Sequence, residues 1–404
     1  MKTFITENKL VLSCIILGLV FAFIRMFIEG VGFGSDGYDI YADYIKNVFR
    51  NTVTPEEEAW FANYRWNNRL VYPLILAILS LITSLNVLAL TIPVGILSYV
   101  CSNIALLKIL EDRGNTKQEI QIIVSVFSLC PALVSNITRL VTDCLFLFLT
   151  LSTILYFQRY TKDGSYKDFF LGCFFIFLAA LTREIGFLLL ASIVLLLVFR
   201  GIYLEKYFLT GFTVVTSILG VLFFLIIFDF DPLSVVRLFF GGETTNLITE
   251  GNFSLADLVC LPFRGQSLYR TITILESLVY TVLIAGTISL VGLLEYDRKE
   301  LIEKIKTSND LLTWIWFTVL SSYLLFIYPS RMQARYWLPI SFVVYLGIHR
   351  GILFINKKTN GRISKNWILL AIILCQAFIT IVRLILLFYS ISLLDLLPDL
   401  FRPV

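Results

Sequence analysis

The sequence predicts an all-α integral membrane protein with about 11–12 transmembrane or membrane-embedded helices and a helical first external loop. Its mean hydropathy is +0.83, and 58% of its 404 residues are hydrophobic. Only 15% are charged, whereas a soluble protein has about 25%. Apolar stretches recur along the whole chain, so we treat residues 1–404 as a single polytopic membrane domain, with large external loops at 30–68 and 229–267.

The apolar segments are the expected helices, and several reach the about 20 residues that a spanning helix needs. Lys2 and Lys9 precede the first one, and no small-residue cleavage site follows it, so we expect a retained helix rather than a signal peptide. The segments lie near 10–29, 70–85, 87–110, 119–136, 140–158, 169–182, 184–200, 207–228, 268–294, 311–328, 338–356 and 367–393.

Basic linkers between these segments predict the orientation, because Lys and Arg accumulate on the cytoplasmic side. The N-terminus is then cytoplasmic and the intervening tips are external. The pair 70–85 and 87–110 must cross the membrane an odd number of times. Either one of the two segments is re-entrant or interfacial, with a broken helix near Asn86 and Pro93, or one of the loop assignments is wrong. The basic linkers are 111–118, 159–168, 200–206, 295–310 and 349–366.

Composition excludes several classes of chemistry. His349 is the only histidine, which rules out a His-based triad or a multi-histidine metal site. The seven cysteines are scattered without a CxxC spacing and read as small buried hydrophobes. The basic loops follow from membrane orientation, so no nucleic-acid partner is expected.

An acidic run follows the first apolar segment. Asp36, Asp39 and Asp43 have the spacing of one helical face. Carboxylates gathered near a membrane suit proton transfer or cation binding. The alternative is a solvated interfacial helix with Tyr38 and Tyr41 in the aromatic belt.

Two arginines occur where apolar segments begin. Arg69 precedes the segment at 70–85, where it either snorkels to the lipid headgroups or binds a phosphate through bidentate hydrogen bonds. Arg139 and Asp143 stand four residues apart at an expected helix start. They form either a local salt bridge or part of a functional site, because a charge inside an apolar run is costly.

Two further clusters are more specific. Arg183 and Glu184 interrupt a long apolar stretch, so they must be buried in protein or line a wet cavity. Arg331, Arg335 and Tyr336 form a late external tip, which suits an anionic headgroup or pyrophosphate, or else aromatic-belt anchoring.

Together these clusters resemble the GT-C class of polytopic membrane glycosyltransferases, which use polyprenyl-phosphate sugars. The resemblance is one of pattern over most of the chain. The matching stretches are the acidic, Tyr-rich 31–49, Arg69-x-x-x-Pro73, Leu140-Val-Thr-Asp143, Ala179-Ala-Leu-Thr-Arg-Glu-Ile-Gly186 and Arg335-Tyr-x-x-Pro339.

The resemblance implies an inverting enzyme of the cell membrane that transfers a sugar to a lipid, glycan or protein acceptor on the external face. Asp36 or Asp39 would be the general base, and Arg183, Arg331, Arg335 and Tyr336 would hold the donor phosphate. Asp43, Arg69, Arg139, Asp143 and Glu184 are the other site candidates, and no metal or cofactor is expected to be required. The alternatives are a lipid-linked glycan flippase and a polysaccharide polymerase or ligase.

Overall fold

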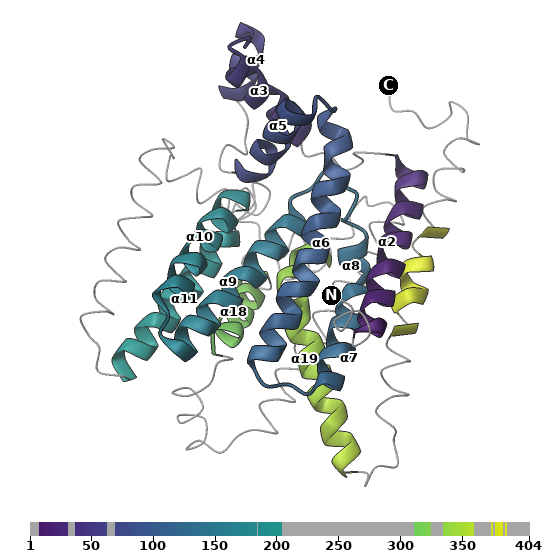
Figure 1. Cartoon of the computed structure of the whole chain (residues 1–404), viewed down its shortest axis with the longest axis vertical. Helices are drawn as coiled ribbons and strands as arrows, with labels where there is room; N and C mark the ends of the chain where they lie inside the picture. Colours follow the sequence, from purple (N-terminus) through teal and green to yellow (C-terminus); the bar gives the residue numbers. More distant parts are fainter. Residues whose placement is uncertain are drawn as a thin grey trace, which may run out of the picture.

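The computed structural model describes residues 8–30, 37–62, 69–183, 185–203, 311–324 and 334–358, with short pieces between 373 and 385. All the regular structure in these ranges is helical, as the sequence predicts (Figure 1). The helices are α2 (Lys9–Glu29), α3 (Tyr38–Arg50), α4 (Pro55–Ala62), α5 (Val71–Thr83), α6 (Val87–Asp112), α7 (Lys117–Ser128), α8 (Pro131–Val134), α9 (Asp143–Asp163), α10 (Tyr166–Thr182), α11 (Ile185–Tyr203), α18 (Leu311–Ser322) and α19 (Ala334–Lys358). The predicted loop 229–267 lies outside the described residues.

Two of the described helices are long and apolar enough to cross a membrane, one at Lys9–Ile28 and one at Val87–Asp112. Their exposed side chains are themselves apolar: Phe27 on α2 is 83% exposed and Leu97 on α6 is 64% exposed. A protein surrounded by water seldom exposes such helix faces. The structure therefore supports a helical protein that associates with a membrane.

The region 70–110 is broken, as expected. α5 ends where Ser84 adopts a left-handed conformation, with a φ of 59°, and α6 begins after Asn86, whose side chain accepts a hydrogen bond from the backbone N–H of Leu88. Pro93 does not interrupt α6, which runs through it. α5 has 13 residues and is about 20 Å long, shorter than the about 30 Å hydrocarbon core of a bilayer.

The expected helix start near residue 140 is wrong. α7 ends at Ser128, and Pro131 begins the single turn α8, because a proline disfavours helix in the residue before it. Residues 135–142 then form an irregular, largely buried segment, and α9 begins at Asp143. Arg139 is therefore not on a helix with Asp143, and Asp143 lies at the first residue of α9 rather than one turn inside it.

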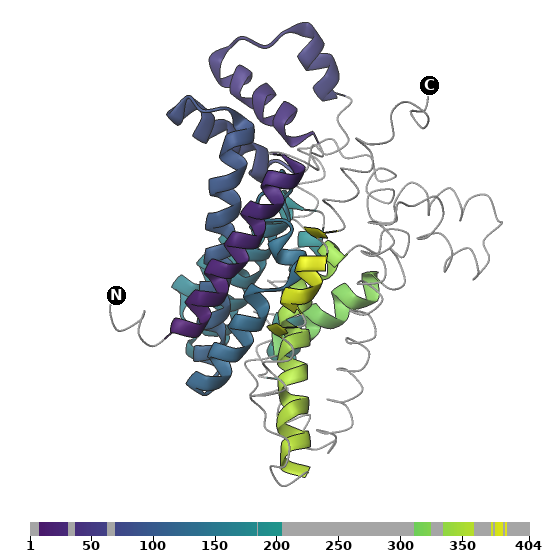
Figure 2. The ribbon, with the colours of Figure 1, turned by 90° about the vertical axis from the view of Figure 1, so that its right-hand side faces the viewer.

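The helices form a bundle in which α9 is central. It packs against α6 and α10, and it also contacts α18 and α19, while α2 packs along α7 (Figure 1). α3 and α4 lie together with α5 at one end of this bundle (Figure 2). We call this the α3 end; the opposite end is where α6 turns into α7 and α9 into α10.

Candidate functional site

A buried ion pair joins α9 to α10 at the α3 end. The guanidinium Nη1 of Arg183 donates to the carboxylate Oδ1 of Asp143, and the two side chains are only 3% and 2% exposed. Asp143 is in the first turn of α9 and Arg183 caps the last turn of α10, so each charge complements the dipole of its helix. Asp143 therefore pairs with a residue 40 positions along the chain. The local salt bridge with Arg139 was one of the two alternatives that the sequence left open.

The turn between α10 and α11 sets the position of Arg183. Arg183 leaves the helix in an extended conformation, its N–H donates to the carbonyl of Ala179 at 3.0 Å, and its carbonyl accepts from Gly186 at 2.9 Å. A Cβ on Gly186 would lie 2.6 Å from the backbone of Ala179. Only glycine lets α11 start so close to the end of α10, and this contact holds Arg183 at the tip, where the sequence predicted a polar junction of two helices.

Tyr336 brings a third helix to the pair. Its ring, 4% exposed in the first turn of α19, lies 4.9 Å from the guanidinium carbon of Arg183. A cation over a tyrosine face is stabilised by about 0.5–2 kcal/mol, with the larger value where water is excluded. The structure therefore brings together Arg183, Asp143 and Tyr336, three of the residues predicted from the sequence.

A second pair adjoins the first. The side chain of Arg69, just before α5, donates from Nη1 to the hydroxyl of Tyr38 on α3 at 2.8 Å, and both residues are buried. The Tyr38 ring meets the Tyr72 ring edge-on at 5.6 Å, and Tyr72 also lies near Asp143. We call Tyr38, Arg69, Tyr72, Asp143, Arg183 and Tyr336 the arginine–tyrosine site.

Asp39 and Asp43, the members of the predicted acidic run that the structure describes, lie on another face of α3. The buried face of this helix carries Tyr38, Tyr41, Ala42 and Ile45, whereas Asp43 is 49% exposed and pairs with Lys46. The aromatic-belt interpretation of Tyr38 and Tyr41 is wrong, because both rings are inside the protein. Burial also raises the pKa of the Tyr41 hydroxyl, which keeps it protonated.

The remaining predicted residues are placed only in part. Asp39 is half-buried on α3, and Arg139 is half-buried in the irregular segment. Arg335 lies in the first turn of α19 beside Tyr336, and its side chain is outside the described residues. Asp36, Glu184 and Arg331 also lie outside the described residues.

Two buried features were not predicted from the sequence. Tyr38, Tyr41, Ala42 and Ile45 follow the spacing i, i+3, i+4 and i+7, which marks one helical face and identifies the tyrosines as buried. Arg25, the only charged residue in the apolar run at 10–28, is 5% exposed. A single charge within such a run is a signal for function that the sequence did carry.

Among the described residues, no group of three or more His, Cys, Asp or Glu side chains is placed to hold a metal ion. The site instead offers guanidinium donors, which match phosphate oxygens, together with tyrosine hydroxyls and a single buried carboxylate. No protein-family model matches the sequence, and no curated protein matches it. The argument for function therefore comes from the site alone.

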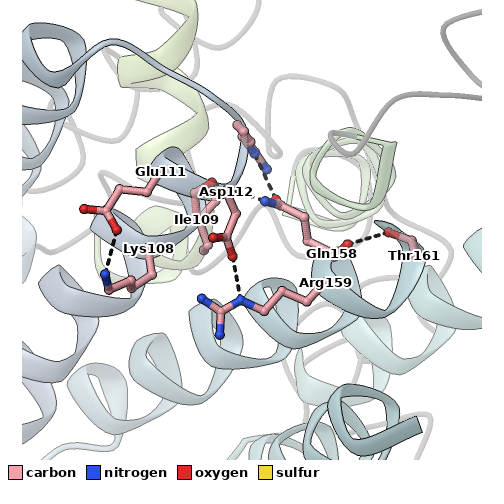
Figure 3. A network of polar contacts seen from close by, with 8 residues as sticks. Lys108, Ile109, Glu111, Asp112, Gln158, Arg159 and Thr161 are labelled. Carbon is pink, nitrogen blue, oxygen red and sulfur yellow. Dashed lines mark hydrogen bonds and ion pairs between the residues drawn. The ribbon is translucent and has the colours of Figure 1, made fainter. Parts of the chain in front are cut away.

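A second polar cluster occupies the opposite end (Figure 3). Arg159 on α9 donates to Asp112 on α6 at 2.6 Å, and their side chains are 32% and 24% exposed. Arg113 joins three elements, because Nε donates to Gln158 at 3.0 Å and Nη2 donates to Thr313 of α18 at 2.5 Å. The pair of Arg159 and Asp112 is within reach of solvent, whereas Gln158 and Thr313 are buried, and together these contacts hold the helix ends against one another.

Proposed function

We propose that this chain is a polytopic membrane glycosyltransferase that transfers a sugar from a polyprenyl-phosphate donor to a lipid, glycan or protein acceptor on the external face. The observation that supports the proposal is the arginine–tyrosine site. Helices α3, α9, α10 and α19 and the start of α5, far apart in sequence, each contribute a charged or phenolic side chain to one buried region. Charges at this depth are costly and are retained mainly for function.

The orientation supports an external site. The linkers at the opposite end carry Arg113 and Lys117 after α6, and Lys162 and Lys167 between α9 and α10. The positive-inside rule assigns that end to the cytoplasm, so the α3 end faces outward. We infer that the short α5 does not cross the membrane, so that α6 alone crosses in 70–110 and the crossing number there is odd; α3 and α9 then begin on the same side. This orientation is consistent with a chain of about 11–12 membrane helices.

Donor binding follows from the arginines. A lipid phosphate is anionic, and guanidinium groups bind it through paired hydrogen bonds. Arg183, supported by Tyr336, would hold the phosphate together with Arg331 and Arg335, which precede and begin α19 in the sequence. Asp143 is the resting partner of Arg183, so the incoming phosphate competes with this carboxylate for the same donors.

The transfer step needs a base on the acceptor. Asp36 or Asp39 would take the proton of the acceptor hydroxyl, whose oxygen attacks C1 of the sugar on the face opposite the phosphate. The bond between C1 and the phosphate oxygen breaks, and polyprenyl phosphate leaves with the bonding electrons. Because the acceptor attacks on the opposite face, the configuration at C1 is inverted. The arginines stabilise the charge on the leaving phosphate.

The test is sugar transfer by purified protein in nanodiscs, with radiolabelled polyprenyl-phosphate sugars and an extract of membrane lipids and glycans. Wild type is compared with Asp36→Asn and Asp39→Asn, and Glu56→Gln, an exposed carboxylate of α4 in the same loop, is the matched control. Loss of transfer in one Asp variant with donor binding intact supports the proposal and identifies the base.

Two other outcomes identify the alternatives. Donor binding without transfer by wild type, with both Asp variants unchanged, would indicate a flippase for lipid-linked glycans. Transfer that depends on Arg183 or Arg335 but on neither Asp would favour a polysaccharide polymerase or ligase.

A further inference from the structure

Arg25 is a buried charge outside the arginine–tyrosine site. It lies on α2, within one of the two helices able to cross a membrane, and only 5% of it is exposed. Its Nη1 donates to the backbone carbonyl of Ser135 at 3.0 Å, 110 residues along the chain. A guanidinium at this depth needs hydrogen-bond acceptors, and the irregular segment 135–142 provides one.

The hydrogen bonds of this segment explain the need for Arg25. In the single turn α8, backbone N–H groups donate to the carbonyls of Pro131, Leu133 and Val134, whereas side chains donate to the carbonyl of Ala132. The carbonyl of Ala132 accepts from the Ser135 hydroxyl at 3.0 Å and from the Asn136 amide at 2.8 Å. The carbonyl of Ser135, which follows this turn, is the acceptor that Arg25 binds. Irregular backbone inside a membrane protein persists only with such partners.

Two further contacts fix the same segment. The hydroxyl of Thr138 donates to the carbonyl of Ala22 on α2 at 3.4 Å. On the other side, a Cβ added to Gly95 of α6 would lie 1.8 Å from the carbonyl oxygen of Ile137, so the two backbones touch. The segment is thus held between α2 and α6, and it ends at Thr142, immediately before Asp143 of the ion pair.

We propose that Arg25 is a positioning residue. By binding the carbonyl of Ser135, Arg25 fixes residues 135–142 against α2. This holds the carboxylate of Asp143 against Arg183, where it competes with a donor phosphate for the guanidinium. The part of this inference that concerns donor binding rests on the proposed function; the part that concerns the position of Asp143 does not.

The first experiment reads the local structure without any substrate. Cys144 follows Asp143 and is 2% exposed, so its reaction with N-ethylmaleimide reports opening of the start of α9. In a full-length chain that keeps Cys144 as its only cysteine, we compare Arg25→Met, which removes the donors, with Arg25→Lys, which keeps a cation and a donor. Arg50→Met, at an exposed arginine of α3, is the control.

The expected result is labelling of Cys144 about tenfold faster in Arg25→Met, and a return to within about twofold of the parent rate in Arg25→Lys. Unchanged labelling in Arg25→Met, or equal acceleration in both variants, overturns the inference. Where Arg25→Met does not fold, Thr138→Val gives the same reading, because it removes the hydrogen bond to Ala22 and keeps the side-chain shape. Its expected acceleration is about threefold, and an unchanged rate counts against the inference.

The second experiment reads the consequence for the site. Because a displaced Asp143 competes less for Arg183, binding of a polyprenyl phosphate to the same variants is expected to tighten about tenfold in Arg25→Met and to return to the parent value in Arg25→Lys. Recovery by lysine separates positioning from a general loss of packing. If the parent protein binds no polyprenyl phosphate, the proposed function fails, and the labelling of Cys144 still decides whether Arg25 positions Asp143.

Discussion

The two ends of the bundle are both held by an ion pair between neighbouring helices, but the two pairs differ in burial. Helix α9 supplies one partner to each pair: Asp143 at the α3 end and Arg159 at the opposite end. The pair at the α3 end is 3% and 2% exposed, whereas the pair at the opposite end is 32% and 24% exposed (Figure 3). The two sites are 16 residues apart on one helix, about 24 Å.

This difference in burial distinguishes a pair that stabilises the fold from a pair for which we propose a function. Exposed ion pairs stabilise a protein by about 0.2–1 kcal/mol, and any helix ends near water can form them. A buried pair gains little net stability, because both charges lose their hydration, yet loss of one partner is severe. Stability alone therefore does not account for Asp143 and Arg183, and this is the physical reason to assign function to the α3 end.

The largest effect is expected for Asp143→Asn. It leaves Arg183 buried opposite a neutral amide, so the free energy of unfolding should fall by about 3–5 kcal/mol. Thermal unfolding in detergent, followed by dye labelling of the buried cysteines, measures the change. The double variant Asp143→Leu/Arg183→Met should recover most of the loss, and a single variant as stable as wild type would show that the pair is not formed in solution.

The irregular segment gives the next largest effect. Gly95→Ala should cost about 3 kcal/mol, because its Cβ meets the backbone oxygen of Ile137, which cannot move without shifting the segment. Gly172→Ala is the matched control: its Cβ would lie 2.8 Å from the Phe157 ring, and a side chain can rotate away. Equal losses in the two variants, measured by the same assay, would contradict the tight contact at Gly95.

A smaller effect is expected at the link between α3 and α5. Tyr38→Phe removes the acceptor of the 2.8 Å hydrogen bond from Arg69 in a buried place, which should cost about 1–2 kcal/mol. Tyr166→Phe, at a tyrosine that is 75% exposed near the opposite end, should change stability very little. A loss at Tyr166 as large as that at Tyr38 would argue that burial is not what distinguishes the two ends.

The sequence predicted the parts of the site that depend on chemistry alone. Arg183 and Asp143 were found because a charge in an apolar run is costly wherever it lies, and the helix junction at Arg183 follows from the polar interruption itself. The partner of Asp143 was not predictable in this way. Pro131 begins the single turn α8, and Arg139 lies in the irregular segment that follows it. Asp143 pairs instead with Arg183, 40 residues along the chain, and this contact depends on how α9 and α10 pack. The spacing of the tyrosines on α3 predicts its buried face, but the interpretation rested on the acidic residues between them, which lie on another face.

Breaking the exposed pair should have little effect. Arg159→Ala removes the contact with Asp112 and is expected to cost about 0.2–1 kcal/mol, with a smaller cost at high salt because solvent ions screen exposed charges. The stability of Asp143→Asn relative to wild type should hardly respond to salt. Thermal unfolding at low salt and in about 1 M salt distinguishes the two cases. A salt-independent loss at Arg159 would mean that its contact with Asp112 is more enclosed than the exposed fractions of the two side chains indicate.

The smallest expected effect lies at the edge of the α3 end. The backbone N–H of Thr54 and the side-chain amide of Asn47 donate to the carboxylate of Glu57, and these hydrogen bonds lower the pKa of that carboxyl. A folded pKa below the unfolded value, about 4.3, means that Glu57 stabilises the junction of α3 and α4 above that pH, and that this contribution disappears as the pH falls through the folded value. Wild type should therefore be slightly more stable than Glu57→Gln near neutral pH and equal to it in acid. A difference that persists at low pH would show that the hydrogen bonds of the side chain, rather than its charge, hold α4 against α3.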